Sequence, residues 1–197
     1  MFDEFLMMDT FITQTCRAAH FHLRNISAVR DLITSDGAAT LVHSLVSSKL
    51  DYCNSLLYNV PKYKTNALQR ILHIAARIVT KSNPEHITPI LKSLHWLPIV
   101  CRIRYKILLT TYKCLNNLAP NYLSSLILPN CPDRVLRSAF KRELKYPETK
   151  LKSYGDRSFS FAAPTEWNKL PLSIKNAPTV DIFKVQLKTF LFKDYYK

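Results

Sequence analysis

Apolar side chains recur every three or four residues over most of this 197-residue chain, the spacing typical of amphipathic helices. The longest such pattern lies between Pro98 and Pro120. Proline accounts for both ends, because it is tolerated in the first turn of a helix and not in its interior. The apolar side of this helix is predicted to hold Val100, Ile107, Leu108, Leu115 and Leu118. The opposite side is basic and holds Arg102, Lys106, Thr110, Lys113 and Asn117.

Arg104 interrupts this pattern, because its position falls within the apolar arc of the same helix. A charged side chain in such a place is expected to find a partner or to extend its head group to the solvent. The basic side of the helix has two interpretations. A solvated surface is typical of any amphipathic helix, whereas a nucleic-acid interface depends on what the rest of the chain contributes.

The same spacing predicts helices near residues 10–26, 36–48, 63–80, 98–118 and 179–194. In the second of these, Leu41, Leu45 and Val46 are expected to face inward. Single prolines separate the patterns, which is typical of helices joined by short turns. The chain has eleven prolines and two glycines, so glycine-rich phosphate-binding loops and tight hairpins are largely excluded.

The composition changes after residue 130. Residues 134–157 carry eight basic and three acidic side chains, interleaved with aromatic residues and leucines. An imperfect period-two alternation predicts a small two-stranded ribbon near Lys141–Tyr146 and Thr149–Ser153. We therefore predict a mainly α fold of helical, bundle-like lobes, with a small two-stranded β element near residues 140–160. The expected domains are a helical one over residues 1–130 and a basic C-terminal extension over residues 131–197, which holds the ribbon and the last helix.

The formal charge is +14 and is unevenly distributed. Residues 1–60 carry four basic and six acidic side chains, whereas residues 61–197 carry 24 basic and eight acidic ones. Such a concentration of positive charge favours a polyanionic partner, RNA or DNA, bound through its phosphates without sequence preference. The candidate contacts are Arg102, Lys106, Lys113, Arg134, Arg137, Lys141, Arg142, Lys145, Lys150, Lys152 and Arg157.

Two tyrosines, Tyr146 and Tyr154, lie among these basic residues. They are candidates for stacking on bases, as aromatic side chains do in single-strand grooves. Ordinary packing explains these two equally well, and it is the better explanation for Phe159 and Trp167.

The sequence also bears on the compartment. No stretch reaches the roughly 18 apolar residues that a membrane span needs, so no membrane partner is expected. The first residues are acidic and lack the basic start of a signal peptide. The five cysteines are odd in number and widely spaced, as is typical of reduced thiols. We expect an intracellular protein of the cytoplasm or nucleus.

Signatures of catalysis and of metal binding are missing from the sequence. Its nine aspartates include no adjacent pair, so the two-metal carboxylate site of polymerases is not predicted. His20 and His22 would share a face only on a strand, and a core or surface role is preferred for both. P-loop, zinc-site and serine-hydrolase motifs are also missing. We expect no enzyme activity, no metal and no cofactor.

Several segments, taken in order, point to a family. They are HFHLRNI (20–26), SSKLDYCNSLLYNVPK (47–62), LQRILHIAARIVT (68–80), HITPILKSLHWLP (86–98), RIRYKILLTTYKCLNNLAPNYLSSL (102–126), LRS (136–138), LKSYGDRSFSFAAPTEWNKLP (151–171) and SIKNAPTVDIFKVQLKTFLF (173–192). This series resembles the C-terminal part of the reverse transcriptase encoded by LINE-type, non-LTR retrotransposons of the jockey-like kind. The resemblance covers nearly the whole chain.

In that family a palm with the catalytic aspartates precedes these segments, and an endonuclease precedes the palm. Met1-Phe2-Asp3 resembles the end of a palm strand, and the F/Y-x-D-D motif has no counterpart here. What is present resembles the thumb and the basic C-terminal extension, which in the family grip the template–primer and the element's own RNA. The resemblance therefore implies a non-catalytic remnant of an RNA-directed DNA polymerase, without palm or endonuclease, that binds nucleic acid.

Two alternatives remain open. The first is a helical protein-interaction module, in which the apolar faces dock a protein and the charge only keeps the surface solvated, although the uneven charge favours nucleic acid. The second is an orphan fragment with no selected function, whose formerly buried surfaces are exposed. A continuous exposed apolar patch on the first 60 residues would favour the orphan fragment.

Overall fold

The computed structural model describes residues 8–82, 85–130, 142–148 and 155–197. Over these residues the chain is mainly α, as predicted, and has no strand longer than a single bridge. It divides into two compact units, Met1–Arg102 with Tyr196 and Ile103–Tyr195 with Lys197. The division falls within a helix, whereas the change in composition had placed it near residue 130.

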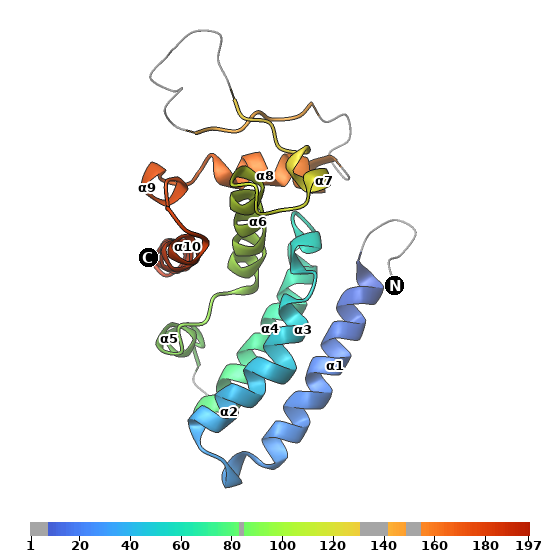
Figure 1. Ribbon diagram of the computed structural model, residues 1–197. Coiled ribbons are helices and arrows are strands. Elements are labelled where there is room, and N and C mark those ends of the chain that lie inside the picture. The colour runs from blue at the N-terminus through green and yellow to red at the C-terminus, as the bar shows by residue number, and fades with distance from the viewer. Residues whose placement is uncertain (1–7, 83–84, 131–141, 149–154) are drawn as a thin grey trace. The chain divides into compact units, whose positions relative to one another are not determined.

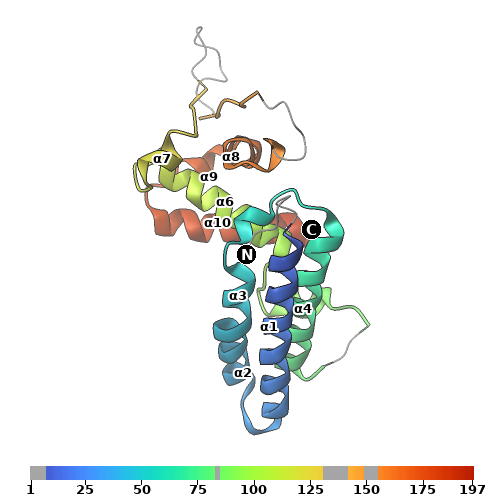
Figure 2. The same ribbon diagram turned by 90° about the vertical axis from the view of Figure 1, so that its right-hand side faces the viewer.

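The first unit is built on three helical rods, α1 (Asp9–Ala28), α2 continued by α3 (Ser35–Val42 and Ser48–Asp51), and α4 (Lys62–Thr80). The rods α1 and α4 run in the same direction and the α2–α3 rod runs against them (Figures 1 and 2). This confirms the helices predicted near 10–26, 36–48 and 63–80. Their shared core contains Ile12, Ala19, Leu23, Ile26, Ala38, Val42, Val46, Leu50, Leu68, Ile71, Leu72, Ala75, Ala76 and Val79.

A single π-helical turn, His43–Ser47, joins α2 to α3. The wider turn shifts the helical register, since five rather than four residues separate the bonded groups. Val46 is fully buried as predicted, but Leu45 is 37% exposed and Leu41 is half-buried. The prediction that all three face inward was therefore wrong for Leu45, because it assumed an uninterrupted α-helical period.

Arg30 closes the turn between α1 and α2, and it is buried although it is charged. Its guanidinium donates to the carbonyl oxygens of Ile78 (2.8 Å) and Val79 (2.7 Å) at the C-terminus of α4. It also donates to Ile33 O at 2.8 Å and to Ser35 Oγ at 3.0 Å. The last carbonyls of a helix lack partners within the helix, so one side chain here satisfies the end of α4 and fixes the turn that follows α1.

A second buried cation, Lys64, lies in the first turn of α4 and is 3% exposed. Its Nζ lies 2.8 Å from Asp9 Oδ1 at the start of α1. This ion pair joins the N-terminal ends of the two rods that run in the same direction. The charge of Lys64 is thus accommodated in a buried position, because a carboxylate from another helix neutralises it.

The helix α6 (Ile99–Leu115) follows the short α5 (Thr88–Ser93). Gln69 Oε1 on α4 accepts a hydrogen bond from Ile99 N at 2.9 Å and satisfies one donor at the start of α6. Trp96, just before α6, is buried with its ring edge-on to His43 at 5.3 Å. These contacts hold the beginning of α6 within the first unit.

The helix predicted at 98–118 is confirmed, but its inward face was only partly right. Ile107 and Leu108 are buried, whereas Val100 is 51% and Leu118 57% exposed. Leu118 lies past the end of the helix, which Asn117 terminates in a left-handed conformation (φ 56). The buried set of α6 also includes Ile99, Cys101, Ile103, Thr111, Tyr112 and Cys114. Because α6 contributes residues to both units, it has buried side chains on more than one of its faces.

The second unit contains the rest of α6 with α7 (Asn121–Ser124), α8 (Phe159–Trp167), α9 (Leu172–Lys175) and α10 (Val180–Tyr195). The helix predicted at 179–194 is therefore confirmed as α10. Its central side chain, Phe183, is fully buried and stacks on Tyr112 of α6 at 4.2 Å between ring centroids. Trp167 of α8 lies 6.1 Å from the same ring, and the Tyr112 hydroxyl donates to Ala177 O at 2.7 Å. Three helices thus meet on one aromatic cluster.

The predicted β ribbon is replaced, over the described residues, by one antiparallel bridge between Pro129 and Leu144. Lys145 N donates to Leu128 O at 2.8 Å and Asn130 N donates to Glu143 O at 2.9 Å. The stretch 142–146 therefore pairs with residues that precede it. The partner strand proposed at 149–153 lies outside the described residues.

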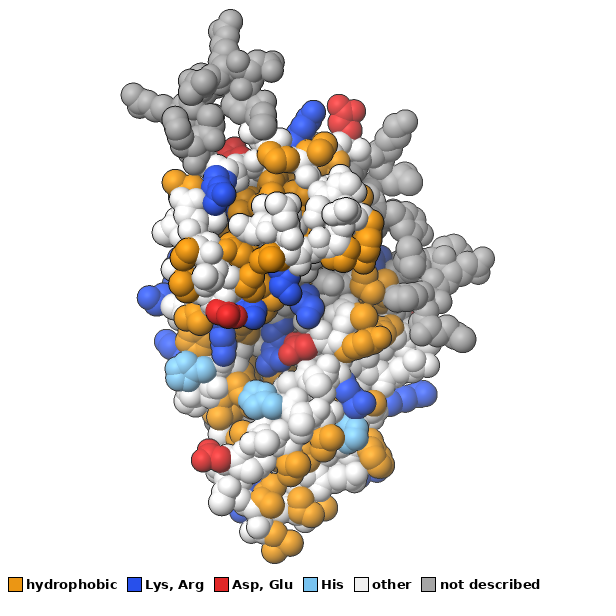
Figure 3. Space-filling model, in the orientation of Figure 1, with side chains coloured by type: hydrophobic (Ala, Val, Ile, Leu, Met, Phe, Trp, Pro, Cys, Tyr) orange, Lys and Arg blue, Asp and Glu red, His pale blue; other side chains and the backbone are white. Residues whose placement is uncertain are grey.

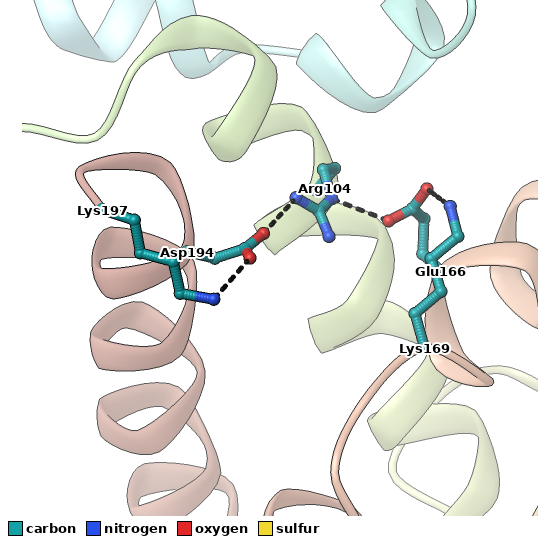
Figure 4. A network of polar contacts seen from close by, with 5 residues as sticks. All are labelled: Arg104, Glu166, Lys169, Asp194 and Lys197. Atoms are coloured by element: carbon teal, nitrogen blue, oxygen red, sulfur yellow. Dashed lines mark hydrogen bonds and ion pairs between the residues drawn. The ribbon is translucent and has the colours of Figure 1, made fainter.

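Arg104 forms the second unit's main polar network, which Figure 4 shows. Its Nε donates to Glu166 Oε2 of α8 at 2.7 Å, and its Nη1 lies 3.5 Å from Asp194 Oδ2 of α10. Lys169 and Lys197 complete the network on Glu166 and Asp194, at 3.0 and 3.7 Å. The expectation that Arg104 finds a partner is confirmed, and it finds two.

Replacing Arg30 by lysine should lower the free energy of unfolding by about 3 kcal/mol, because one ammonium group leaves several buried carbonyl oxygens without a donor. Urea unfolding followed by circular dichroism measures this. Arg24→Lys is the matched control, because Arg24 is exposed and makes no ion pair or hydrogen bond with the described residues. Equal stability of the two variants would contradict the role given to Arg30.

The Arg104 network should make the second unit's stability depend on pH. Burial raises the pKa of Glu166, but hydrogen bonds from Lys169 and Arg104 lower it by more, so the folded pKa lies below the ordinary value of 4.5. A depressed carboxylate pKa adds stability above 4.5, and this is lost as the pH falls through the folded pKa.

Accordingly, Glu166→Gln should cost about 2–3 kcal/mol at pH 7, and its deficit relative to the unmodified chain should shrink as the pH is lowered from 6 to 3. Unfolding curves at a series of pH values measure both effects. Asp181→Asn is the control, since the Asp181–Lys184 pair is exposed, and it should leave the unfolding midpoint unchanged. A pH-independent deficit for Glu166→Gln would contradict the assignment.

Candidate nucleic-acid interface

The basic side of α6 is narrower than the sequence predicts. Arg102 is held inside the first unit, where its Nη1 lies 2.9 Å from Asp51 Oδ2 and its Nε donates to Leu97 O at 2.8 Å. Its side chain is only 12% exposed, so its charge is neutralised in place. Lys106 is exposed and Lys113 half-buried, and neither forms an ion pair with the described residues. Two of the three α6 candidates therefore remain open to a phosphate.

These two lysines lie on one face of α6, because seven residues make almost two helical turns. Thr110 lies between them, and its hydroxyl donates to Lys106 O at 3.0 Å. Its side chain is uncharged, so the positive charge of this face comes from the two lysines. The spacing along the axis is about 10 Å. The pair forms a short basic stripe on the second unit.

The segment 142–148 contributes two further candidates with different environments. Arg142 is exposed, yet its Nη1 donates to Lys175 O (3.2 Å) and Asn176 Oδ1 (3.1 Å) at the end of α9. Its own carbonyl accepts from Trp167 Nε1 at 2.9 Å. Arg142 is thus part of the local fold, and its left-handed backbone (φ 49) is held by these contacts. Lys145 is exposed and has no ion pair among the described residues.

Tyr146, the stacking candidate next to Lys145, is 51% exposed. Its ring makes no aromatic contact with other described residues, so it is open to a ligand from solvent. Glu143 and Glu148 lie in the same segment and balance the charges of Arg142 and Lys145. The described part of this basic segment therefore has no net charge.

The remaining candidates are placed differently. Arg157 ends a 3₁₀ turn (Gly155–Arg157) and is half-buried, and its buried Nε has no hydrogen-bond partner within the described ranges. Outside the described residues lie Arg134, Arg137, Lys141, Lys150, Lys152 and Tyr154. The structure thus brings Lys106 and Lys113 together on α6 and leaves Lys145 on a separate segment.

Sequence reasoning missed cations in the first unit, because it treated residues 1–60 as net acidic. Three of the carboxylates there are already paired, Asp9 with Lys64, Asp31 with Lys81 and Asp51 with Arg102. The signal was available as helical periodicity, which puts Arg17 and Arg24 seven residues apart on one face of α1.

Some basic side chains have no acidic partner in the described part of the structure, and we call these residues the uncompensated set. Its members form no ion pair with any described residue: Arg17, Arg24, Lys49, Lys62, Arg70, Lys92, Lys106, Lys113, Lys145, Lys188 and Lys193. In Figure 3, Lys and Arg side chains are distributed over the visible face more widely than Asp and Glu. Both units therefore carry positive charge that faces solvent.

The described residues contain no group of three or more His, Cys, Asp or Glu side chains that could hold a metal ion. Burial raises the pKa of the Cys16 and Cys114 thiols, which keeps both protonated at neutral pH. Among the helices of the described ranges, none combines the length and the apolar character needed to cross a membrane.

Comparison with known proteins returned no match, whether to a family model, to a curated protein or to a solved structure.

Proposed function

We propose that this chain binds RNA or DNA without sequence preference, through lysine and arginine contacts to phosphates and without polymerase activity. The observation that carries the proposal is the uncompensated set of surface cations, within a chain of formal charge +14. Cations whose charge is not neutralised inside the fold attract phosphate and release its condensed counterions. A cytoplasmic or nuclear location follows from such a partner.

The resemblance to the thumb and C-terminal extension of non-LTR reverse transcriptases supports the same proposal independently of the charge. In this interpretation the chain is a non-catalytic part of such an enzyme, and its helices grip a backbone while the chemistry belongs to other domains. Lys106, Lys113 and Lys145 are the most favourable phosphate contacts among the residues chosen from the sequence, because none of them forms an ion pair with the described part of the chain. Arg102 and Arg142 are structural residues and are removed from the proposed interface.

Replacing Lys106, Lys113 and Lys145 together by alanine should weaken binding to single-stranded RNA and DNA of any sequence. It should also make the slope of log K against log salt shallower by about two to three, one released counterion for each lost contact. Filter binding over a salt series measures this, and thermal melts check that folding is unchanged.

The matched control replaces Lys81, Lys184 and Lys197 by alanine, which removes the same formal charge. Each of these lysines already pairs with an aspartate, at 2.6, 2.9 and 3.7 Å respectively. Their loss should leave the salt slope almost unchanged. If both triple variants change the slope equally, binding depends on net charge alone and the assigned contacts are wrong.

A second prediction concerns activity. The purified chain should incorporate no nucleotides on a primed RNA template with Mg²⁺ or Mn²⁺, because two-metal phosphoryl transfer needs closely placed carboxylates and the sequence has no adjacent aspartate pair. A primer-extension assay against a buffer control tests this, and template-dependent extension would overturn it.

A further inference from the structure

The first unit carries an open groove on the side where α1 and α4 lie together. The groove is about 770 Å³ in volume and is lined by residues of these two helices. A second hollow of about 360 Å³ continues it toward the C-terminal ends of the helices, and the two share Ser27, Ile74 and Ile78. Along α1 the groove extends from Arg17 to Ala28, about three helical turns or 16 Å.

Apolar side chains from both helices line the groove, together with His20, Ser27 and two arginines. Phe21 from α1 is 60% exposed there, and Ile74 and Ile78 from α4 are only half-buried. Ala28 adds a small side chain that lets another backbone approach. An exposed phenylalanine beside two incompletely buried isoleucines is the surface that an apolar partner covers favourably, at roughly 25 cal/mol for each Å² removed from water.

The sides of the groove are positively charged. Arg17 and Arg24 on α1 are exposed and uncompensated and line the groove, and Arg77 on α4 lines the second hollow. Arg77 Nε is buried and has no hydrogen-bond partner among the described residues, so this donor lacks an acceptor that a ligand carboxylate would supply. One carboxylate, Asp31, lines the far end, and Lys81 neutralises it at 2.6 Å.

We propose that the α1–α4 groove docks an acidic amphipathic helix of a protein partner. Two parallel helices offer a third one a row of holes between their ridges, and the occupant would complete a four-helix arrangement with the α2–α3 rod. Its apolar stripe covers Phe21, Ile74 and Ile78, and its flanking carboxylates reach the three arginines. The two isoleucines favour a helix over a nucleic acid, since a sugar–phosphate backbone has no apolar side chains to cover them.

This surface lies on the first unit and does not use Lys106, Lys113 or Lys145, the lysines assigned to phosphate binding. Arg17 and Arg24 do belong to the uncompensated set, so competition between a peptide and an oligonucleotide distinguishes the two proposals. The probe is a labelled 18-residue peptide with leucines at helical spacing i, i+3, i+4 and i+7 and glutamates on both flanks. Fluorescence anisotropy with the full chain gives its Kd. A scrambled peptide of the same composition has the same charge without the apolar stripe, and it should bind at least tenfold more weakly.

Two variants locate the peptide in the groove. Arg17→Glu with Arg24→Glu should weaken peptide binding by at least tenfold more than Lys49→Glu with Lys92→Glu, which removes equal charge from exposed, uncompensated positions outside the groove. Phe21→Ala should weaken it several-fold with no change of charge. Circular dichroism melts confirm that each variant is folded, as expected for exposed positions.

Equal binding of the scrambled peptide, or equal loss in the two charge-reversal variants, would overturn the proposal, because attraction to net charge then explains the binding. A single-stranded oligonucleotide serves as the competing ligand. If Arg17→Glu with Arg24→Glu abolishes oligonucleotide binding and leaves peptide binding intact, the groove is a nucleic-acid site and the helix-docking proposal fails.

Discussion

Several helix ends in this chain take a left-handed backbone conformation at a residue other than glycine, since the sequence has only two glycines. Over the described residues no glycine takes a left-handed conformation, and several helices and turns end on Asn59, Lys81, His95 or Asn117 instead. Each such residue costs on the order of 1 kcal/mol of backbone strain. At the end of α4, next to Lys81, the guanidinium of Arg30 helps to offset this cost, because it donates long-range hydrogen bonds to Ile78 O and Val79 O.

The positions of the helices and the faces that they bury follow from the sequence to different degrees. Helix positions were predictable, because the core residues of α1 and α4 repeat at a strict helical period and prolines mark the boundaries. Buried faces were less predictable. Val100 and Leu45 satisfy the local pattern and are exposed all the same. The π-helical turn before α3 and the division of α6 between two units each change which face of a helix is buried. Neither feature can be detected in the local spacing of apolar residues.

The candidate nucleic-acid interface was also only partly predictable from the sequence. Lys106 and Arg102 are equivalent by periodicity, yet one is exposed and the other pairs with Asp51 from a distant part of the chain. The net charge was thus predictable from the sequence. Which cations remain unpaired on the surface was not, because tertiary contacts determine which cation each carboxylate pairs with. Helical periodicity already places Arg17 and Arg24 on one face of α1, whereas the pairing of Asp9, Asp31 and Asp51 with other cations is visible only in the structure.

The chain has two tryptophans, and each is buried in a different unit. Trp96 lies against the His43 ring, whereas Trp167 lies beside Phe183 and donates to Arg142 O. The protein therefore carries one intrinsic fluorophore for each unit. Conservative replacement of one indole by phenylalanine leaves the emission of the other, so the order in which the units lose structure is readable from ordinary fluorescence without any attached label.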